Sequence, residues 1–479
     1  MGAVLIESLQ MWWPETILSL GALVVIVLGV WSKRPQPALT AGWVSLLASG
    51  VALWRVPATG NTNLFFGLII CDPFSLALRW IAWASIVIVL LLVMASRDIE
   101  PALRGECAGL LLLIGVGLML MAEANHLLMA YLSMELVSLS SYVLVGFQHE
   151  PRSAEASLKY LLFGALSSGI MLFGMSLLFG LTRSLAFPDL LRASAGLSGP
   201  TTGALMVAVS LLLAGLAFKI SMVPFHMWTP DAYEGAPIPV TALLSVGPKA
   251  AGLALLLRLT TALRPAWPSL GPLVIGLTIV TMTLGNLVAL AQTNVKRLLA
   301  YSTIGQVGYL LIGFAVNTRH GLEGLLLYLV AYLFMNLGAF ACVVAVVNDT
   351  GSESLEAFRG LARRSPGLAL LCAVFLLSLA GLPPLLGFFG KFLLFGAAIE
   401  ANHPALAIAG ILNSAVALYY YVNIIRLMYF IAPTQPAPLR TPAALRWAVG
   451  LCAAATIVMG FFPGPLLALL GSSTIVNLL

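Results

Sequence analysis

Four charged side chains lie within long apolar stretches of the sequence, where ionisable groups are costly. They are Glu135, Lys219, Lys249 and Lys391, each with apolar residues on both sides. A charge at the centre of a membrane-spanning helix costs roughly 2.5–3.5 kcal/mol on insertion scales. Such residues mark functional positions, and a carboxylate together with several lysines is a set of groups that can exchange protons.

These four residues are interpreted as a proton relay. Burial favours the neutral form of a lysine, whereas a nearby carboxylate favours the charged form. The two opposed effects allow a buried lysine to release and recapture a proton. The alternative is a static ion pair between Glu135 and Lys219 that only fixes packing. One glutamate, however, cannot neutralise three lysines.

Two weaker candidates are Lys159 and His226. Lys159 begins an apolar run, where it either anchors the helix at the membrane surface or takes part in the relay. His226 follows Lys219 by seven residues, which places both on one face if the helix is continuous. It either bonds a carbonyl freed by the nearby prolines or shuttles protons.

Four further polar residues flank these apolar runs. We expect Glu123 and His126 to be solvated in a short loop. Asp231 and Glu234 are expected to brace the loop after a helix break.

The composition excludes a soluble protein. Of 479 residues, 60% are hydrophobic and 9% charged, whereas soluble domains carry about 25% charged residues. Apolar runs recur that are long enough to cross a hydrocarbon core of about 30 Å as helices. The sequence therefore predicts an all-α integral membrane protein, a single membrane domain over 1–479, with the lipid bilayer as a partner.

Other function classes are not supported. The net charge of +6 comes from scattered basic residues, which excludes nucleic acid as a partner. The five cysteines lack CxxC spacing and fit small apolar packing residues, so this chain is expected to hold no metal and no cofactor. No nucleotide-binding or nucleophile motif lies in a usable context.

About fourteen transmembrane helices are predicted, of which helices 7 and 12 are interrupted by prolines. The first span follows a segment without Lys or Arg, so we expect it to be retained rather than cleaved as a signal peptide. Interrupted helices at matching places in two halves point to a transport site. The predicted spans are 14–31, 39–56, 73–95, 107–122, 125–147, 159–181, 203–223, 239–262, 268–291, 298–316, 322–347, 366–400, 404–431 and 445–470.

Basic residues predict the orientation, because they concentrate in cytoplasmic loops. With the N-terminus outside, fewer basic residues fall in outer loops, and an even number of spans returns the C-terminus to the same side. Both termini are therefore predicted on the non-cytoplasmic side of a membrane, most simply the bacterial inner membrane. The inner set is Lys33, Arg34, Arg97, Arg104, Arg152, Lys159, Lys296, Arg297, Arg359, Arg363, Arg364, Arg440 and Arg446, and the outer set is Arg55, Arg183, Arg192, Arg264 and Arg319.

The sequence resembles itself at an offset of roughly 166 to 170 residues. YVLVGF at 142–147 matches YLLIGF at 309–314, and AGL at 214–216 matches AGL at 380–382. Equivalent segments are five spans apart, and an odd number of spans inverts the second copy. We therefore expect three N-terminal helices (1–106), a first five-helix repeat (107–262), a second, inverted repeat (268–431) and a last helix (445–470).

Several long motifs carry a family resemblance. GLAFKISMVPFHMWTPDAYEGAPIPVTALLSVGPKAAG, at 215–252, resembles the signature of the antiporter-like membrane subunits of respiratory complex I and of related cation/proton antiporters. ANHLLMAYLSMELVSLSSYVLVGF, EASLKYLLFGA, QTNVKRLLAYSTIGQVGYLLIGF and LSLAGLPPLLGFFGKFLLF resemble the subunit N branch, the subunit 2 type of mitochondria. The resemblance covers roughly residues 70 to 430.

The resemblance implies roles for individual residues. Glu135 corresponds to the family's glutamate of span 5, Lys219 to the lysine of span 7, Lys249 to that of span 8 and Lys391 to that of span 12. Lys219 follows its AGL by three residues and Lys391 by nine, so the symmetry of the two half-pathways is only approximate.

The resemblance also implies that the chain is a subunit of a proton-translocating NADH-quinone oxidoreductase. Flavin, iron–sulfur clusters and the quinone site are then expected in partner subunits, and further antiporter-like subunits beside this one. The alternatives are a subunit of a sodium/proton antiporter and a passive scaffold. The three buried lysines argue against a scaffold.

Overall fold

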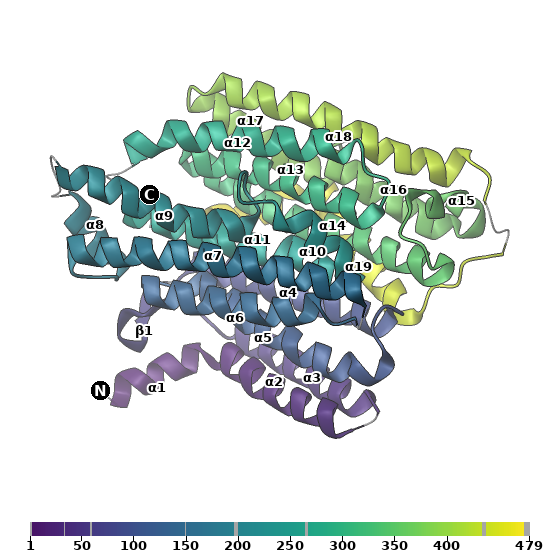
Figure 1. Cartoon of the computed structure of the whole chain (residues 1–479), viewed down its shortest axis with the longest axis horizontal. Helices are drawn as coiled ribbons and strands as arrows, with labels where there is room; N and C mark the ends of the chain where they lie inside the picture. Colours follow the sequence, from purple (N-terminus) through teal and green to yellow (C-terminus); the bar gives the residue numbers. More distant parts are fainter. Residues whose placement is uncertain are drawn as a thin grey trace.

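The computed structural model describes residues 2–32, 34–57, 60–148, 150–195, 200–263, 267–433 and 437–473. Lys33 and Arg264, which entered the orientation prediction, lie outside these ranges. The described helices run side by side across the molecule, roughly along one direction (Figure 1). Thirteen of them are long and apolar enough to cross a membrane. The predicted span 366–400 is missing from that set because it is split into two shorter helices. The prediction of an all-α membrane bundle is confirmed.

An N-terminal group of helices precedes the repeats. Its last helix begins with a capping box, in which Asp72 and Ser75 each bind the other's backbone N–H. The first short helix and a small hairpin were not predicted, since both are too short to give a periodic signal. The elements are α1 Gly2–Met11, α2 Trp13–Trp31, α3 Gln36–Trp54, β1 Thr62–Leu64, η1 Phe65–Gly67, β2 Ile69–Cys71, α4 Pro73–Ala95 and η2 Pro101–Leu103.

Two sets of helices follow, matching the predicted repeats. The first contains α5 Arg104–Glu123, α6 Leu127–Val145, α7 Pro151–Thr182, α8 Phe187–Ala195, α9 Pro200–Ile220, α10 Trp228–Gly235 and α11 Ile238–Ala262. The second contains α12 Trp267–Ala289, α13 Val295–Val316, α14 Arg319–Thr350, η4 Leu355–Phe358, α15 Leu361–Arg364, α16 Pro366–Ala380, α17 Leu386–Glu400 and α18 Pro404–Phe430.

The last predicted span, 445–470, is wrong at its end. The helix α19 covers Ala443–Phe461, and a separate helix, α20, covers Pro463–Ser473. Pro463 has no backbone N–H to continue α19 and suits the first turn of a new helix.

Matching local features show that the two sets are repeats. Both α7 and α14 contain 32 residues and end at a residue with positive φ, Arg183 and Gly351. Isolated bridges join His126 to Ala186 and Asn294 to Ser354, and both partners are 168 residues apart (294 − 126 and 354 − 186). The short helices α8 and α15, which follow α7 and α14, lie at opposite ends of the bundle (Figure 1). The second repeat is therefore inverted.

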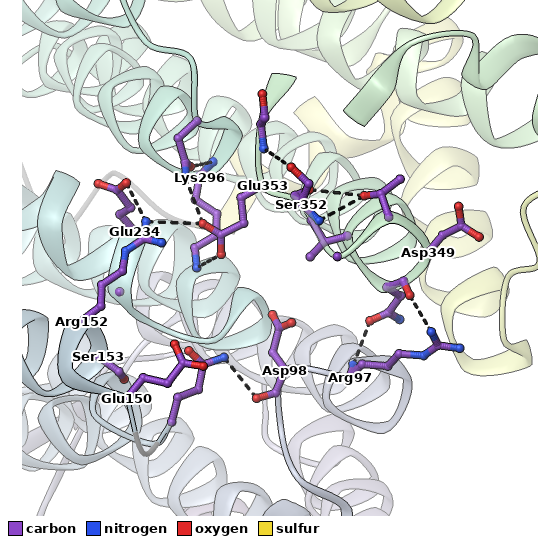
Figure 2. Close-up of a pocket in the computed structure, with 18 of the residues that line it drawn as sticks. Arg97, Asp98, Glu150, Arg152, Ser153, Glu234, Lys296, Asp349, Ser352 and Glu353 are labelled. Atoms are coloured by element: carbon purple, nitrogen blue, oxygen red, sulfur yellow. Dashed lines mark hydrogen bonds and ion pairs between the residues drawn. The ribbon is translucent and has the colours of Figure 1, made fainter. Parts of the chain in front are cut away.

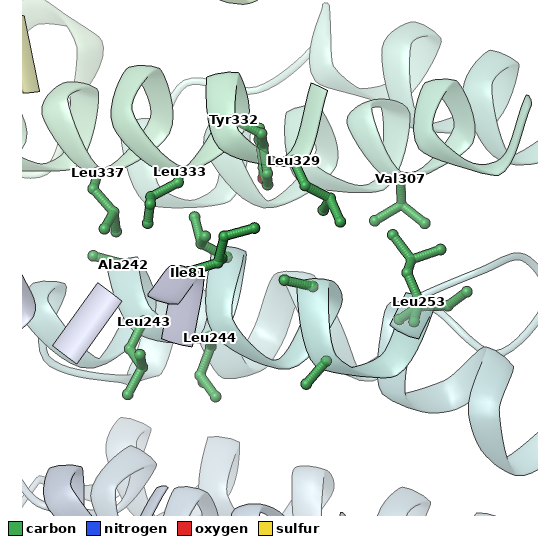
Figure 3. Close-up of a cluster of buried hydrophobic side chains, with 14 of the residues drawn as sticks. Ile81, Ala242, Leu243, Leu244, Leu253, Val307, Leu329, Tyr332, Leu333 and Leu337 are labelled. Atoms are coloured by element: carbon green, nitrogen blue, oxygen red, sulfur yellow. The ribbon is translucent and has the colours of Figure 1, made fainter. Parts of the chain in front are cut away.

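The core lies where the two repeats meet. Helix α11 is buried over nearly its whole length. Leu329, Leu333 and Leu337 of α14 point toward α11, as Figure 3 shows. Large apolar side chains such as Leu162 and Leu166 of α7 are instead exposed, as expected of a surface that faces lipid. The repeat interface is thus the buried centre of the molecule, and both helix breaks lie beside it.

Candidate functional site

Two interrupted helices position the buried lysines. Helix α9 ends at Ile220 and α10 begins at Trp228, while α16 ends at Ala380 and α17 begins at Leu386. Each interruption contains a cis X–Pro bond, Val223–Pro224 and Pro383–Pro384. The predicted interruptions of helices 7 and 12 are confirmed. An interrupted helix leaves carbonyl oxygens without intrahelical donors, so other groups must supply the hydrogen bonds.

At the first break, Lys219 lies one residue before the end of α9. Its side chain is fully buried, and Nζ donates a hydrogen bond to Ser138 Oγ at 3.0 Å. Glu135, one turn earlier on α6, accepts a hydrogen bond from Ser168 of α7. Among the described residues no ion pair joins Lys219 to Glu135. Lys219 of α9 therefore binds α6 one turn away from Glu135, and Ser138 in turn donates to the Met134 carbonyl.

Lys249 lies between the two breaks, on α11. Its Nζ is 4.7 Å from the ring centroid of Trp228 and 5.3 Å from that of Tyr233, both on α10. No residue in the described ranges accepts a hydrogen bond from this buried ammonium. Aromatic faces attract a cation without accepting its protons as a carboxylate would. Lys249 is thus a buried lysine without a counter-ion.

Trp228 also closes the first break. Its indole Nε1 donates to the carbonyl of Phe218 at 3.0 Å, near the end of α9. Tyr160 of α7 stacks on the same ring at 4.2 Å. The Phe218 carbonyl also accepts from the backbone N–H of Ser221 at 3.1 Å, so Trp228 adds a second donor there, joins α10 to the end of α9 and places its ring beside Lys249.

At the second break, the lysine itself supplies the missing donor. Lys391 of α17 donates from Nζ to the carbonyls of Leu379 and Ala380, at 3.0 and 3.1 Å, and to Ser414 Oγ at 3.4 Å. The same nitrogen lies 4.1 Å from the ring centroid of Tyr309. Lys391 is thus held by neutral oxygens at the end of α16.

A polar group that the sequence analysis did not single out adjoins Lys391. Gln306 of α13 donates to the Leu379 carbonyl at 3.1 Å and to Tyr421 Oη at 3.2 Å. Its amide oxygen accepts a hydrogen bond from Tyr328. A glutamine in the middle of the predicted span 298–316 was a signal that could have revealed this group.

A second polar contact lies one turn away. Tyr332 donates to Thr303 Oγ1 at 3.0 Å, and Tyr332 follows Tyr328 by four residues on α14. Both tyrosines are fully buried. Side chains that can donate and accept protons therefore line the interface of α13 and α14, between Lys249 and Lys391.

The two weaker candidates lie apart from this interior set. Lys159 is half exposed and pairs with Glu155 and Asp231, at 2.8 and 3.0 Å. His226 is partly buried, and its Nδ1 has no hydrogen-bond partner among the residues described. The condition for His226 and Lys219 to share a helix face, a continuous helix, is not met, because α9 ends at Ile220, before Pro224.

One expectation about the loop residues is also wrong. Glu123 is not solvated: its side chain is fully buried, and Oε1 lies 3.0 Å from Arg79 Nη1. It lies under α2 and the β1–β2 hairpin, neither of which a loop assignment takes into account. His126 is partly buried and caps α6, with Nδ1 accepting from the backbone N–H of Leu128 at 3.2 Å.

A charged cavity of about 810 Å³ opens at the end of the repeat interface (Figure 2). Helix α10 and the segment after α14 contribute to its wall. Arg297 bridges Asp231 and Glu234 at 2.9 and 2.7 Å, which confirms that these acids brace the segment after the break. Arg152 reaches Glu234 at 2.6 Å.

Two carboxylates of this cavity have shifted pKa values. Burial raises the pKa of Asp98, although the backbone N–H of Ile238 donates to it at 3.1 Å. Partial burial acts in the same direction on Glu353, but Lys296, at 2.6 Å, and Asn294 outweigh it and hold the pKa of Glu353 below its usual value. The cavity therefore holds one acid whose pKa is raised and one whose pKa is lowered.

Comparison with known proteins agrees with this geometry. Residues 124–417 match the family model for the membrane region of NADH:quinone oxidoreductase and Mrp antiporters. Subunit N of NADH-quinone oxidoreductase from Anaeromyxobacter sp. is 42% identical over 486 residues, which cover 95% of this chain and 94% of that protein. A chain of respiratory complex I from Thermus thermophilus with bound aureothin is 32% identical, with a TM-score of 0.83, over 96% of this chain and all (100%) of that one. A chain of the Mrp complex from Dietzia sp. has a TM-score of 0.87 at 22% identity, covering 97% of this chain and 96% of that one, and shows likeness of fold alone.

Proposed function

Since the chain belongs to the family of NADH-quinone oxidoreductase subunit N, we propose that it is a non-redox, proton-translocating subunit of such a complex. In this proposal flavin, iron–sulfur clusters and quinone are bound by partner subunits, and further antiporter-like subunits lie beside this chain in the membrane. Redox chemistry elsewhere drives proton movement here.

The observation that carries the proposal is the isolation of the buried lysines. Lys219, Lys249 and Lys391 are buried, and among the described residues none of them contacts a carboxylate. A protonated lysine in such surroundings makes no direct ion pair, so small changes around it can shift the balance between its charged and neutral forms. Static packing alone does not account for three such residues.

The proposed relay runs from Glu135 through Lys219 and Lys249 to Lys391. Helix α9 packs against α11 at Gly252, where an added Cβ atom would lie 2.6 Å from Ile220 Cγ2 and 3.7 Å from Lys219 Cγ. Gly252 is three residues from Lys249, so the first two lysines lie near the same contact between α9 and α11. The buried hydroxyls and Gln306 between α13 and α14 continue the path toward Lys391. Lys159 and His226 are weaker members, at the edge of the path.

The test substitutes Glu135→Gln, which keeps the side-chain shape and removes the charge. Ser133→Ala on the same helix is the matched control, because Ser133 donates only to its own helix at Ala130. The complex is purified, reconstituted into vesicles and assayed for proton pumping and linked electron transfer. Glu135→Gln should assemble and pump well below wild type. An assembled Glu135→Gln complex that pumps normally would rule out the glutamate as a relay member.

The purification also separates the two candidate settings. A large complex with flavin and iron–sulfur absorbance supports the oxidoreductase. Isolation with antiporter subunits that lack these chromophores would favour the sodium/proton antiporter, for which fold likeness is the present support.

The orientation is part of the same proposal. The charged cavity, with Arg97, Arg152 and Lys296 on its wall, faces the cytoplasm of a bacterial cell with both termini on the other side of the inner membrane. A topology reporter placed in the segment 349–365 should read as inside, and one fused after residue 479 as outside. The same reading at both positions would contradict this orientation.

A further inference from the structure

A second buried charge cluster lies outside the lysine relay. Glu15 of α2, Arg79 of α4 and Glu123 of α5 are all fully buried. Arg79 binds Glu15 with two hydrogen bonds, Nε to Oε1 at 2.8 Å and Nη2 to Oε2 at 2.7 Å. Its remaining nitrogen, Nη1, lies 3.0 Å from Glu123 Oε1. One guanidinium thus serves two carboxyl groups.

The two carboxyl groups are not equally satisfied. Glu15 takes both strong bonds of a bidentate pair. Glu123 is close to Arg79, but at an angle that makes no hydrogen bond, and neither of its oxygens has a hydrogen-bond partner in the described part of the chain. An ionised carboxylate without hydrogen bonds is strongly disfavoured in an apolar interior.

Among the residues that the structure describes, no neighbouring charge compensates for the extra carboxylate. The other charged groups that act on Glu123 are Asp72 and Arg258, and these two neutralise each other in a bidentate pair at 2.8 and 2.9 Å. Cys71 also adjoins Arg79, and burial raises the pKa of its thiol to about 11, so it adds no charge at neutral pH. The cluster therefore holds one negative charge more than it can balance.

We propose that Glu15, Arg79 and Glu123 form a proton-binding site, in which two carboxyl groups at one guanidinium share a single bound proton. The bound proton removes the unbalanced charge from the buried cluster. No relay residue takes part, so this inference does not rest on the proposed function.

A small pocket lies near the site. Arg258 of α11 donates from Nε to the carbonyl of Ala122, next to Glu123, at 2.8 Å. Asp72 and Arg258 in turn line a pocket of about 220 Å³. The site therefore lies toward the end of the bundle that carries α8 and the hairpin, the predicted non-cytoplasmic side. Arg258 and Lys249 both lie on α11.

The test is infrared spectroscopy of the purified complex at neutral pH, in H₂O and in D₂O. The variants are Glu123→Gln and Glu15→Gln, with Glu106→Gln on α5 as the matched control. After either substitution in the cluster, the remaining carboxylate balances Arg79 one to one and stays ionised. The C=O band of one protonated carboxyl group, shifted in D₂O, should therefore be lost in both cluster variants and kept in Glu106→Gln.

Each other outcome contradicts the proposal. If the variants lose only carboxylate bands, both glutamates are ionised in the wild type and no proton is bound. Glutamine is the neutral isostere of a protonated glutamic acid, so failure of both single variants to assemble would also overturn it. Arg79→Gln should reduce the amount of assembled complex more than either single glutamate substitution, and equal loss would contradict the shared role of the guanidinium.

Discussion

The two helix breaks have the same backbone plan but place their lysines differently. Lys219 precedes its break on α9 and binds one hydroxyl, that of Ser138. Lys391 follows its break on α17 and binds the carbonyls of Leu379 and Ala380. At the first break a tryptophan indole donates to the Phe218 carbonyl, which also accepts from a backbone N–H, whereas at the second the lysine itself donates to the carbonyls that end α16. Lys219 therefore donates no hydrogen bond to the backbone at its break, whereas Lys391 holds the end of α16 by two such bonds.

The breaks also differ in their nearest acid. Glu135 lies nine residues after His126, the N-cap of α6, and Thr303 occupies the same place after Asn294, the N-cap of α13. The second repeat thus carries a hydroxyl where the first carries a carboxylate. The comparison indicates that the first break is suited to changing the protonation of its lysine. The second is suited to receiving a proton while holding its helix ends together.

The two breaks should differ most in stability when each lysine is replaced by methionine, an apolar residue of similar length. Lys391→Met removes the donor to the Ala380 carbonyl, and a buried acceptor left without a partner costs about 1–3 kcal/mol. The Leu379 carbonyl keeps Gln306 as a donor. Lys391→Met should therefore lower the thermal midpoint and the amount of assembled complex.

Lys219→Met is the matched variant. It leaves only the Ser138 hydroxyl, which still donates to the Met134 carbonyl at 2.8 Å. Assembly should therefore be close to wild type. The thermal midpoint of each purified complex is measured by thermal denaturation. An equal decrease in the two variants would contradict the proposed difference between the breaks.

A smaller effect on stability is expected from the ion pair of Lys296 and Glu353, which joins the end of α10 to the second repeat. Lys296 donates to the Ala236 carbonyl, just after α10, at 2.8 Å and pairs with Glu353. Because the folded state lowers the pKa of Glu353, the pair stabilises the protein above the unfolded value of about 4.3. That contribution is lost as the pH falls through the folded pKa.

The measurement compares wild type with Glu353→Gln by thermal denaturation over a pH series. The wild type should be the more stable at neutral pH, and the difference should shrink as the pH falls below about 4.3. A difference that grows toward acid pH would mean that Glu353 does not contribute through its charge.

Local signals explain how much of the fold could be predicted. Apolar runs set the spans, and prolines beside AGL at 214–216 and 380–382 set both breaks. The positions of Lys219 and Lys391 relative to these prolines follow directly from the chain. The different hydrogen-bond partners of the two lysines could not be predicted from the sequence, because they depend on the positions of Ser138 and of the carbonyls at the end of α16.

Long-range contacts explain what the sequence did not reveal. Glu123 looks like a loop residue next to Asn125 and His126, and only folding brings Arg79 to it. The partner Glu15 is separated from Arg79 by 64 residues. Such a cluster has no spacing pattern, because its members come from three different helices. The end of α19 at Phe461, by contrast, could have been predicted from Pro463.

The central claim is that buried lysines change protonation during turnover, and Lys219→Arg tests it most directly. Arginine preserves the positive charge but stays protonated, because its pKa exceeds about 12. Proton pumping is measured in vesicles and normalised to the amount of assembled complex. The relay account predicts that Lys219→Arg assembles and pumps poorly, and pumping near the wild-type rate would contradict it.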